Sequence, residues 1–263
     1  MNLADKNIFI TGASAGIGKS MVAYCAAQGV QNIAVMGRRA EMLEALRTEF
    51  PEVNFVCIAG DLGQPTDVKR AISTLEDQWD HLDILVNNAG VVSAGPIEQI
   101  SDEDIIQMIQ INVTGLILLT KGLAPLLAKS TGGGVMNVSS GLGYIARPYY
   151  SVYAATKAAV KQFTDSLRRE WHDRPLHMMT VFPTATDTPM MTTAKMDRAM
   201  DSPDMVAEKS MEGMVKGERE VIFGGEQRIQ DIKLDFNDPE AMDAKMVANL
   251  EAMYERTKEH RAM

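Results

Sequence analysis

Short runs of β-branched and other apolar residues recur along the chain, with longer helical patterns between them. Seven such runs are found, at Asn7–Ile10, Ile33–Met36, Asn54–Ile58, Ile84–Asn87, Val135–Ser139, Met178–Phe182 and Glu220–Phe223. This alternation indicates βαβ units, whose strands form a parallel sheet with helices on both faces. Because crossovers between parallel strands are right-handed, we predict a doubly wound α/β fold of about seven strands.

The chain is predicted to form one domain. Its 263 residues are enough for a full hydrophobic core. We find no internal repeat, low-complexity tract or linker that divides it. The single domain therefore spans residues 1–263, and the segment after the sixth strand, approximately 184–215, is its expected substrate-loop region.

The charge balance argues against nucleic acid and membrane surfaces as partners. Lys and Arg number 26 and Asp and Glu 35, so the formal net charge of -9 repels phosphates and anionic lipids. The N-terminus shows no signal-peptide pattern, and we count no apolar run long enough to span a bilayer. Only two cysteines occur, Cys25 and Cys57, which fits a reducing compartment. We therefore expect a cytoplasmic protein.

A glycine-rich turn, TGASAGIG, joins the first strand to the first helix. Gly12, Gly16 and Gly18 allow a close backbone approach, and the helix N-terminus offers N–H groups to a pyrophosphate. This signature predicts dinucleotide binding in a Rossmann fold, with Ser14 and Ile17 between the glycines as further contacts. The alternative is a turn that serves only to reverse the chain.

The end of the second strand favours NADP(H) over NAD(H). A site for the free ribose 2′-hydroxyl usually carries Asp or Glu there. Gly37, Arg38 and Arg39 stand there instead, and a guanidinium suits a 2′-phosphate. The alternative is that the arginines only solvate a helix start.

Polar and glycine residues follow the third and fourth strands. Asp61 and Leu62 follow the third strand, and Asn88, Ala89 and Gly90 follow the fourth. The carboxyl ends of parallel strands form the ligand crevice, so we assign these residues to the cofactor site. Ordinary turn chemistry is the alternative.

The stretch YAATK suggests acid/base chemistry. Tyr153 and Lys157 lie four residues apart on one helix face, so the ammonium is expected to lower the high pKa of the phenol. Tyr153 would then exchange a proton with a substrate, while Lys157 also holds the nicotinamide ribose. Ser140, at the end of the fifth strand, would hydrogen-bond the reacting oxygen. Taken singly, these are ordinary residues of a solvated helix face and a turn.

These motifs together resemble the short-chain dehydrogenase/reductase family, in the order TGASAGIG, NNAG, INVTG, NVSS and YAATK. The resemblance covers nearly the whole chain. It implies hydride transfer at the nicotinamide, with Ser140 rather than Ser139 as the active serine. For Asn112 it implies a helix irregularity and a water-linked proton relay to Lys157.

The resemblance extends past the sixth strand. It implies that Pro183 and Thr188 contact the cofactor, Thr188 through the carboxamide. The family most often has glycine where this chain has Thr184, so a different local backbone path is expected. The resemblance also implies homotetramers or homodimers, built on helices around residues 102–129 and 151–172.

The substrate is less well defined by the sequence. Met190, Met191, Met196 and Met200 predict either a mobile lid over a moderately apolar carbonyl compound or simple helix packing. Arg147 either binds a substrate carboxylate or is exposed. A last helix with its methionines on one stripe is predicted after Pro239. The four histidines show no metal-ligand spacing, so no metal is expected and none of the four is given a chemical role.

The leading hypothesis is an NADP(H)-dependent enzyme that interconverts a ketone or aldehyde and its alcohol. A non-catalytic dinucleotide sensor of the same fold is the alternative, but it has no need of Ser140, Tyr153 and Lys157 together. A sugar-nucleotide epimerase or dehydratase would need a larger C-terminal region than this chain has.

Overall fold

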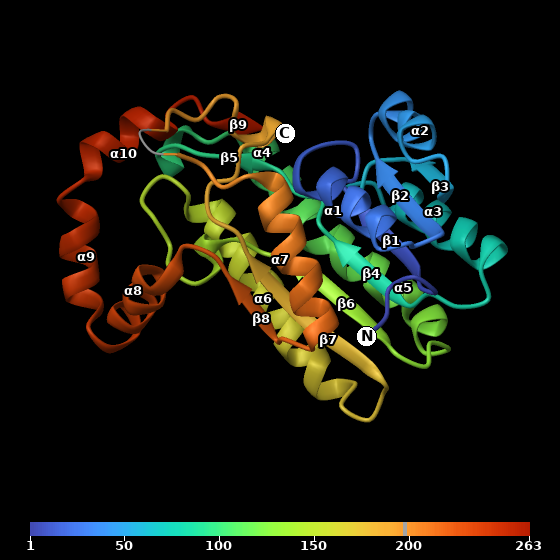
Figure 1. Cartoon of the computed structure of the whole chain (residues 1–263). Helices are drawn as coiled ribbons and strands as arrows, with labels where there is room; N and C mark the ends of the chain where they lie inside the picture. Colours follow the sequence, from blue (N-terminus) through green and yellow to red (C-terminus); the bar gives the residue numbers. More distant parts are fainter. Residues whose placement is uncertain (197–198) are drawn as a thin grey trace.

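The computed structural model describes residues 1–196 and 199–263. Its centre is a seven-stranded sheet in the order β3-β2-β1-β4-β6-β7-β8, and every neighbouring pair is parallel. The strands are β1 (Asn7–Thr11), β2 (Asn32–Gly37), β3 (Asn54–Ala59), β4 (Ile84–Asn87), β6 (Gly133–Val138), β7 (Leu176–Phe182) and β8 (Glu220–Ile222). The predicted doubly wound α/β fold is confirmed (Figure 1).

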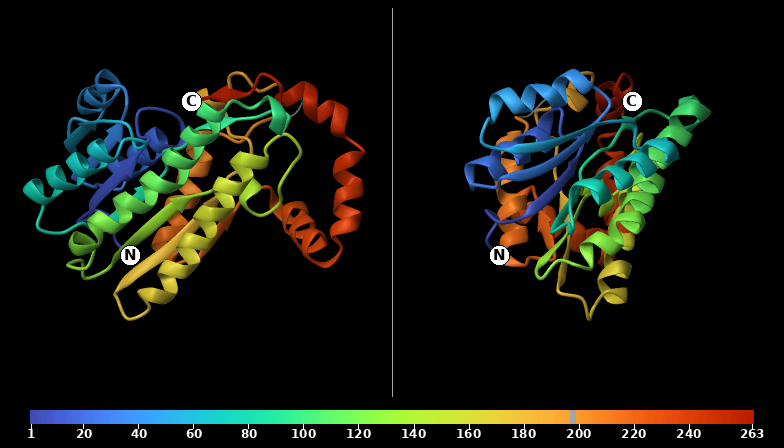
Figure 2. Two further views of the ribbon diagram at one scale, coloured as in Figure 1. Left: turned by 180° about the vertical axis from the view of Figure 1, so that it is seen from behind. Right: turned by 90° about the vertical axis from the view of Figure 1, so that its right-hand side faces the viewer.

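Helices cover both faces of the sheet (Figures 1 and 2). On one face lie α1 (Gly16–Ala27), α2 (Ala40–Glu49) and α7 (Pro203–Lys216); on the other lie α3 (Pro65–Gln78), α5 (Leu116–Leu127) and α6 (Ser151–Glu170). Successive side chains of β1 point to opposite faces of the sheet. Ile8 and Ile10 pack in the hydrophobic core under α1, α2 and α7, and Phe9 packs in the core under α3, α5 and α6. All three side chains are fully buried.

A long helical segment runs from Asp102 to Leu127. It consists of α4 (Asp102–Ile109), the wider π-helical turn η2 (Gln110–Gly115) and α5. By length and composition these 26 residues could cross a membrane, so the expectation that no such segment exists is wrong. In the fold the segment packs against α3, α6 and β4. Ile106 and Ile109 of α4 remain exposed on the helix that the resemblance implicates in subunit contacts, which stays a prediction.

The chain after β8 forms an arm of three helices that returns to the carboxyl ends of the strands (Figure 1). The arm comprises α8 (Gly225–Asn237), α9 (Pro239–Val247) and α10 (Leu250–Thr257). Ser202 and Asp238 are the N-caps of α7 and α9, because Ser202 Oγ accepts from Met205 N and Asp238 Oδ1 accepts from Ala241 N. The predicted single last helix is wrong, because Ala248 and Asn249 interrupt it.

The arm ends in a short strand, β9 (Arg261–Ala262), which pairs antiparallel with β5 (Val92–Ser93). The described residues also form three short 3-10 turns after strands β5, β6 and β7: η1 (Ile97–Gln99), η3 (Gly141–Gly143) and η4 (Pro189–Met191). The last residues of the chain therefore lie beside the segment that follows β4.

Candidate active site

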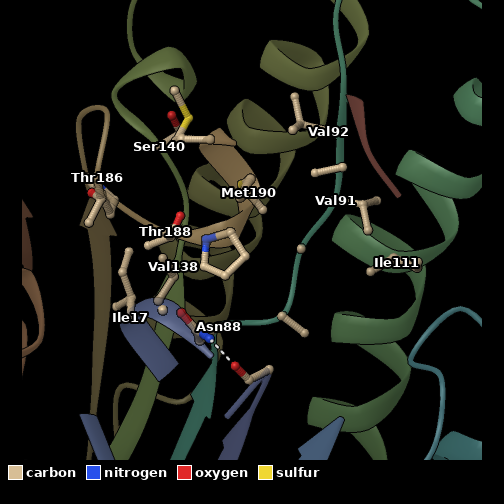
Figure 3. Close-up of a pocket in the computed structure, with 18 of the residues that line it drawn as sticks. Ile17, Asn88, Val91, Val92, Ile111, Val138, Ser140, Thr186, Thr188 and Met190 are labelled. Atoms are coloured by element: carbon tan, nitrogen blue, oxygen red, sulfur yellow. Dashed lines mark hydrogen bonds between the residues drawn. The ribbon is translucent and has the colours of Figure 1, made fainter. Parts of the chain in front are cut away.

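The carboxyl ends of the strands open into a cavity of about 710 Å³. It lies where the strand order reverses, between β1 and β4, the usual ligand position in such sheets. Figure 3 shows Asn88, Val138 and Ser140 around it, with Thr186, Thr188 and Met190 from the substrate-loop region and Val91, Val92 and Ile111 facing them. Nearly all the sequence-predicted site residues line this cavity; Gly18 and Asn112 lie behind its wall.

The glycine-rich turn has the geometry that a bound pyrophosphate needs. Gly12 and Gly16 have φ of 69° and 54°, a left-handed conformation that side chains rarely adopt. A Cβ on Gly18 would collide with the carbonyl oxygen of Gly12. The N-cap residue of α1, Ala15, makes no side-chain hydrogen bond, so the first N–H groups of the helix face the cavity uncapped. These residues fit a dinucleotide phosphate.

Asn88 fixes this turn to the end of β4. Its side-chain nitrogen donates to the carbonyl oxygen of Thr11 at 2.9 Å, and the Thr11 hydroxyl accepts from Asn88 N and Ala89 N. Asn88 thus acts on the cofactor site by joining β1 to β4, while Ala89 and Gly90 line the cavity with Ser14 and Ile17.

The far end of the cavity contains both predicted arginines. Arg39 donates to Ser14 Oγ at 3.2 Å, and Arg38 donates to the backbone oxygen of Met263 at 3.0 Å. Asp61 and Leu62 form the neighbouring wall, where Asp61 accepts from Gly63 N. Two guanidinium groups beside the nucleotide turn suit a 2′-phosphate.

Tyr153, Lys157 and Ser140 meet at the other end. Lys157 Nζ lies 5.7 Å from the centre of the Tyr153 ring and donates to the carbonyl oxygen of Val138 at 3.0 Å. Ser139 points away, because its hydroxyl donates to the backbone oxygen of Lys157. Ser140, by contrast, lies close enough to Tyr153 to act on the pKa of its hydroxyl.

Burial controls the proton affinities of this group. Burial raises the pKa of Tyr153 to about 12, while the hydrogen bond with Ser140 acts in the opposite direction. Burial also lowers the pKa of Lys157 to about 8. The expectation that Lys157 lowers the pKa of Tyr153 is not met, since the ammonium lies over the ring and bonds to Val138. Tyr153 therefore keeps its proton at neutral pH.

Asn112 lies in the π-helical turn and is almost wholly buried. Its side chain accepts from Val91 N at 2.8 Å and donates to Val91 O at 2.9 Å and Thr156 Oγ1 at 3.1 Å. Asn112 and Lys157 both lie next to Gly90. A Cβ atom placed on Gly90 would be 3.3 Å from Asn112 Oδ1 and 3.3 Å from Lys157 Nζ. The helix irregularity implied by the resemblance is present, and the relay stays a prediction.

Thr184 closes the substrate-loop region on itself. Its hydroxyl donates to the carboxylate of Asp201, and Asp201 N donates to Ala185 O at 2.9 Å. Pro183 and Thr188 line the cavity, and Thr188 packs against Gly16 at the start of α1. Residues 197 and 198 of this region lie outside the described residues. The threonine thus joins the two ends of the loop, an interaction that glycine could not make.

Sequence reasoning missed two residues of the cavity wall. His260, given no role, is 3% exposed and lines the cavity, and Arg228 lies beside Gly141, next to Ser140. Arg147 is half-buried on the wall rather than exposed. No sequence signal marked His260 or Arg228, because the arm carries them back to the site only in the folded chain. Within the described part of the chain, no group of three or more His, Cys, Asp or Glu could hold a metal ion.

The fold, the glycine turn and the Ser, Tyr and Lys group define an oxidoreductase of the short-chain type. The chain belongs to the short chain dehydrogenase family, whose model matches residues 6–199.

Curated relatives support this assignment. A serine 3-dehydrogenase of Agrobacterium fabrum is 36% identical over 69% of this chain and 72% of its own length. An NADP-dependent 3-hydroxy acid dehydrogenase of Schizosaccharomyces pombe is 31% identical over 71% of this chain and 73% of its own. Among solved structures, a short-chain dehydrogenase from Sphingobium yanoikuyae in complex with NADPH covers 91% of this chain and 96% of its own, with a TM-score of 0.79 and 27% identity.

Proposed function

We propose that this protein is an NADP(H)-dependent oxidoreductase that interconverts a carbonyl compound and its alcohol. The observation that carries the proposal is that Ser140, Tyr153 and Lys157 meet in the same cavity as the uncapped N-terminus of α1. A dinucleotide sensor would need the second feature but not the first. The cofactor is NADP(H) because Arg38 and Arg39 flank the nucleotide turn.

The three side chains divide the proton chemistry between them. When bound, the nicotinamide supplies or accepts the hydride. In reduction, Tyr153 gives its proton to the carbonyl oxygen, and its raised pKa keeps that proton available at neutral pH. Ser140 hydrogen-bonds the same oxygen, where negative charge develops. Lys157, whose pKa burial lowers to about 8, would hold the ribose of the nicotinamide beside Tyr153.

The substrate end of the cavity favours a compound with a carboxylate. Arg147 and Arg228 line the cavity, Arg228 beside Gly141, and Met190, Met191 and Met196 provide apolar wall. Among the lining residues that the structure describes, the one acidic side chain is Asp61, which follows β3. The relatives named as hydroxy acid and serine dehydrogenases agree with this choice. We therefore propose a hydroxy acid and its oxo acid as the substrate pair.

The test is NADPH consumption with short 3-oxo acids and with the methyl esters of the same acids. We expect the acids to react with a kcat/KM at least about tenfold higher, because the ester lacks the charge that the arginines bind. Arg147→Met and Arg228→Met should each reduce this preference. Arg169→Met, an exposed arginine of α6, is the matched control and should leave it unchanged.

Tyr153→Phe separates catalysis from binding. The variant should bind NADPH as the native protein does and lose at least about 10²-fold in kcat, the usual contribution of a general acid. NADPH binding without turnover of any compound by the native protein would favour the sensor. Equal turnover of acids and esters would overturn the substrate class alone.

A further inference from the structure

The last residues of the chain form part of the wall of the cavity. In the pairing of β9 with β5, Ala262 lies opposite Val92 and Arg261 opposite Ser93, and Ala94 N donates to His260 O at 2.9 Å. Val92 and Ala262 both line the cavity. The C-terminal tail, defined here as residues 260–263, is thus held against the segment that follows β4.

Arg261 anchors this tail. Its Nε and Nη2 donate to the two carboxylate oxygens of Asp104 at 2.7 and 2.8 Å, a two-bond geometry that fixes orientation as well as position. Asp104 belongs to α4 and is buried. Arg261 N also donates to Thr193 Oγ1 at 3.1 Å, which joins the tail to the substrate-loop region.

The anchored tail presents His260 with both ring nitrogens engaged. Nε2 lies 3.0 Å from the carbonyl oxygen of Met190, and Nδ1 lies 2.7 Å from the hydroxyl of Tyr150. A carbonyl oxygen can only accept, so Nε2 carries the proton and Nδ1 accepts from Tyr150. One neutral tautomer of His260 therefore fits these two partners together.

Both partners of His260 are walls of the substrate end of the cavity. Tyr150 lies beside the acid/base tyrosine, with its ring centre 6.3 Å from that of Tyr153. Met190 comes from η4 on the substrate-loop region. The tail thus joins the start of α6 to η4 across the site.

We propose that His260 is a positioning residue for substrate binding, which acts by fixing the Tyr150 hydroxyl and the Met190 backbone at the cavity. The expected change in KM rests on the proposed function, because it requires that the protein reduces an oxo acid. The C-terminal tail, far from the acid/base group in sequence, then determines how well a substrate fits beside Tyr153. The tail leaves the proton transfer itself to Ser140, Tyr153 and Lys157.

The kinetic test is a double-mutant cycle of His260→Leu and Tyr150→Phe, with His172→Leu, an exposed histidine, as control. Each variant should raise the KM for the oxo acid about tenfold, the usual effect of one lost hydrogen bond, with little change in kcat. The double variant should be no worse than His260→Leu alone, because both act through the same bond. Independent, additive effects, or an unchanged KM in His260→Leu, would overturn the proposal.

A second readout does not require turnover. In protein labelled with ¹⁵N-histidine, the ring nitrogens of His260 should show a protonated Nε2 and an unprotonated, hydrogen-bonded Nδ1. Tyr150→Phe should shift the Nδ1 resonance and leave the resonances of His172 unchanged. If Tyr150→Phe leaves Nδ1 unshifted, the positioning role is wrong. If the native protein shows the expected spectra but reduces none of the carbonyl compounds, it is the proposed function that fails.

Discussion

Lys157 occupies an environment that disfavours its own charge. Its side chain is 3% exposed, and burial lowers its pKa from 10.5 to about 8. The compensating contacts are one carbonyl oxygen, that of Val138, and the face of the Tyr153 ring. Folding the protein at neutral pH therefore includes the cost of burying an ammonium group beside the Tyr153 ring.

This cost predicts a stability that rises with pH. Between pH 8 and pH 10 an unfolded chain keeps the Lys157 proton, with a pKa of 10.5, and the folded chain has released it. The unfolded state binds more protons, so the free energy of unfolding should increase by about 2 kcal/mol across this window. Urea unfolding of the native protein and of Lys157→Met would measure it. Equal pH dependence in the two proteins would contradict the buried, shifted lysine.

The proximity of Tyr153 and Lys157 could be predicted from the sequence because their spacing is local. Tyr153 and Lys157 share one helix, and four residues are enough to place them together. Their proton affinities could not be predicted, since these depend on how much of the fold covers them. The sequence suggested a lowered pKa for Tyr153, whereas burial by elements remote in the chain raises it.

At the scale of elements, the π-helical turn Gln110–Gly115 directs Asn112 toward the segment after β4. An ordinary helical turn would place the residue differently, because a π-turn contains an extra residue. The backbone N–H and C=O of Val91 therefore form their hydrogen bonds with the Asn112 side chain, and not with the backbone of a neighbouring strand. Such turns frequently occur at functional sites.

Asn112→Ala tests this role. The substitution leaves the buried N–H and C=O of Val91 without their side-chain partner, so it should lower the free energy of unfolding by on the order of 2–3 kcal/mol. Urea unfolding would measure the loss. Gln110→Ala, in the same π-turn, is the control and should cost under about 1 kcal/mol. Equal losses in the two variants would show that Asn112 has no special structural role.

The short elements were harder to predict than the sheet. Seven runs of apolar residues gave the strands of the main sheet, because buried strands have a strong sequence pattern. The two-residue strands β5 and β9 carry no such pattern. Their pairing depends on the arm, of which the part after Pro239 was predicted as one uninterrupted helix.

At the scale of the whole molecule, the substrate-loop region and the C-terminal tail behave as one unit. His260 and Arg261 of the tail bond to Met190 and Thr193, and Lys195 N donates at 3.1 Å to Arg256 O in α10, just before the tail. The bonded residues are more than sixty positions apart in the chain, and the two segments together line one side of the cavity. Neither segment can move away from the site without breaking bonds to the other.

Amide hydrogen exchange tests this coupling. On addition of NADPH and an oxo acid, exchange should slow in residues 188–196 and 259–263 together, because closure over a ligand stabilises their shared hydrogen bonds. Peptides from the second half of α3, residues 72–78, none of which lines the cavity, provide the control. Protection of one segment without the other would contradict a coupled closure. Unchanged exchange in both would count against a lid.

The pairing of β9 with β5 brings a part of the chain outside the family model to the wall of the cavity. The family model ends at residue 199, so the acid/base group lies inside the shared part of the chain and His260 and Arg228 lie beyond it. One cavity is thus lined by residues from inside and from outside the part of the chain that the family model matches. Mutations in the last sixty codons would alter the wall formed by the C-terminal tail and leave Ser140, Tyr153 and Lys157 unchanged.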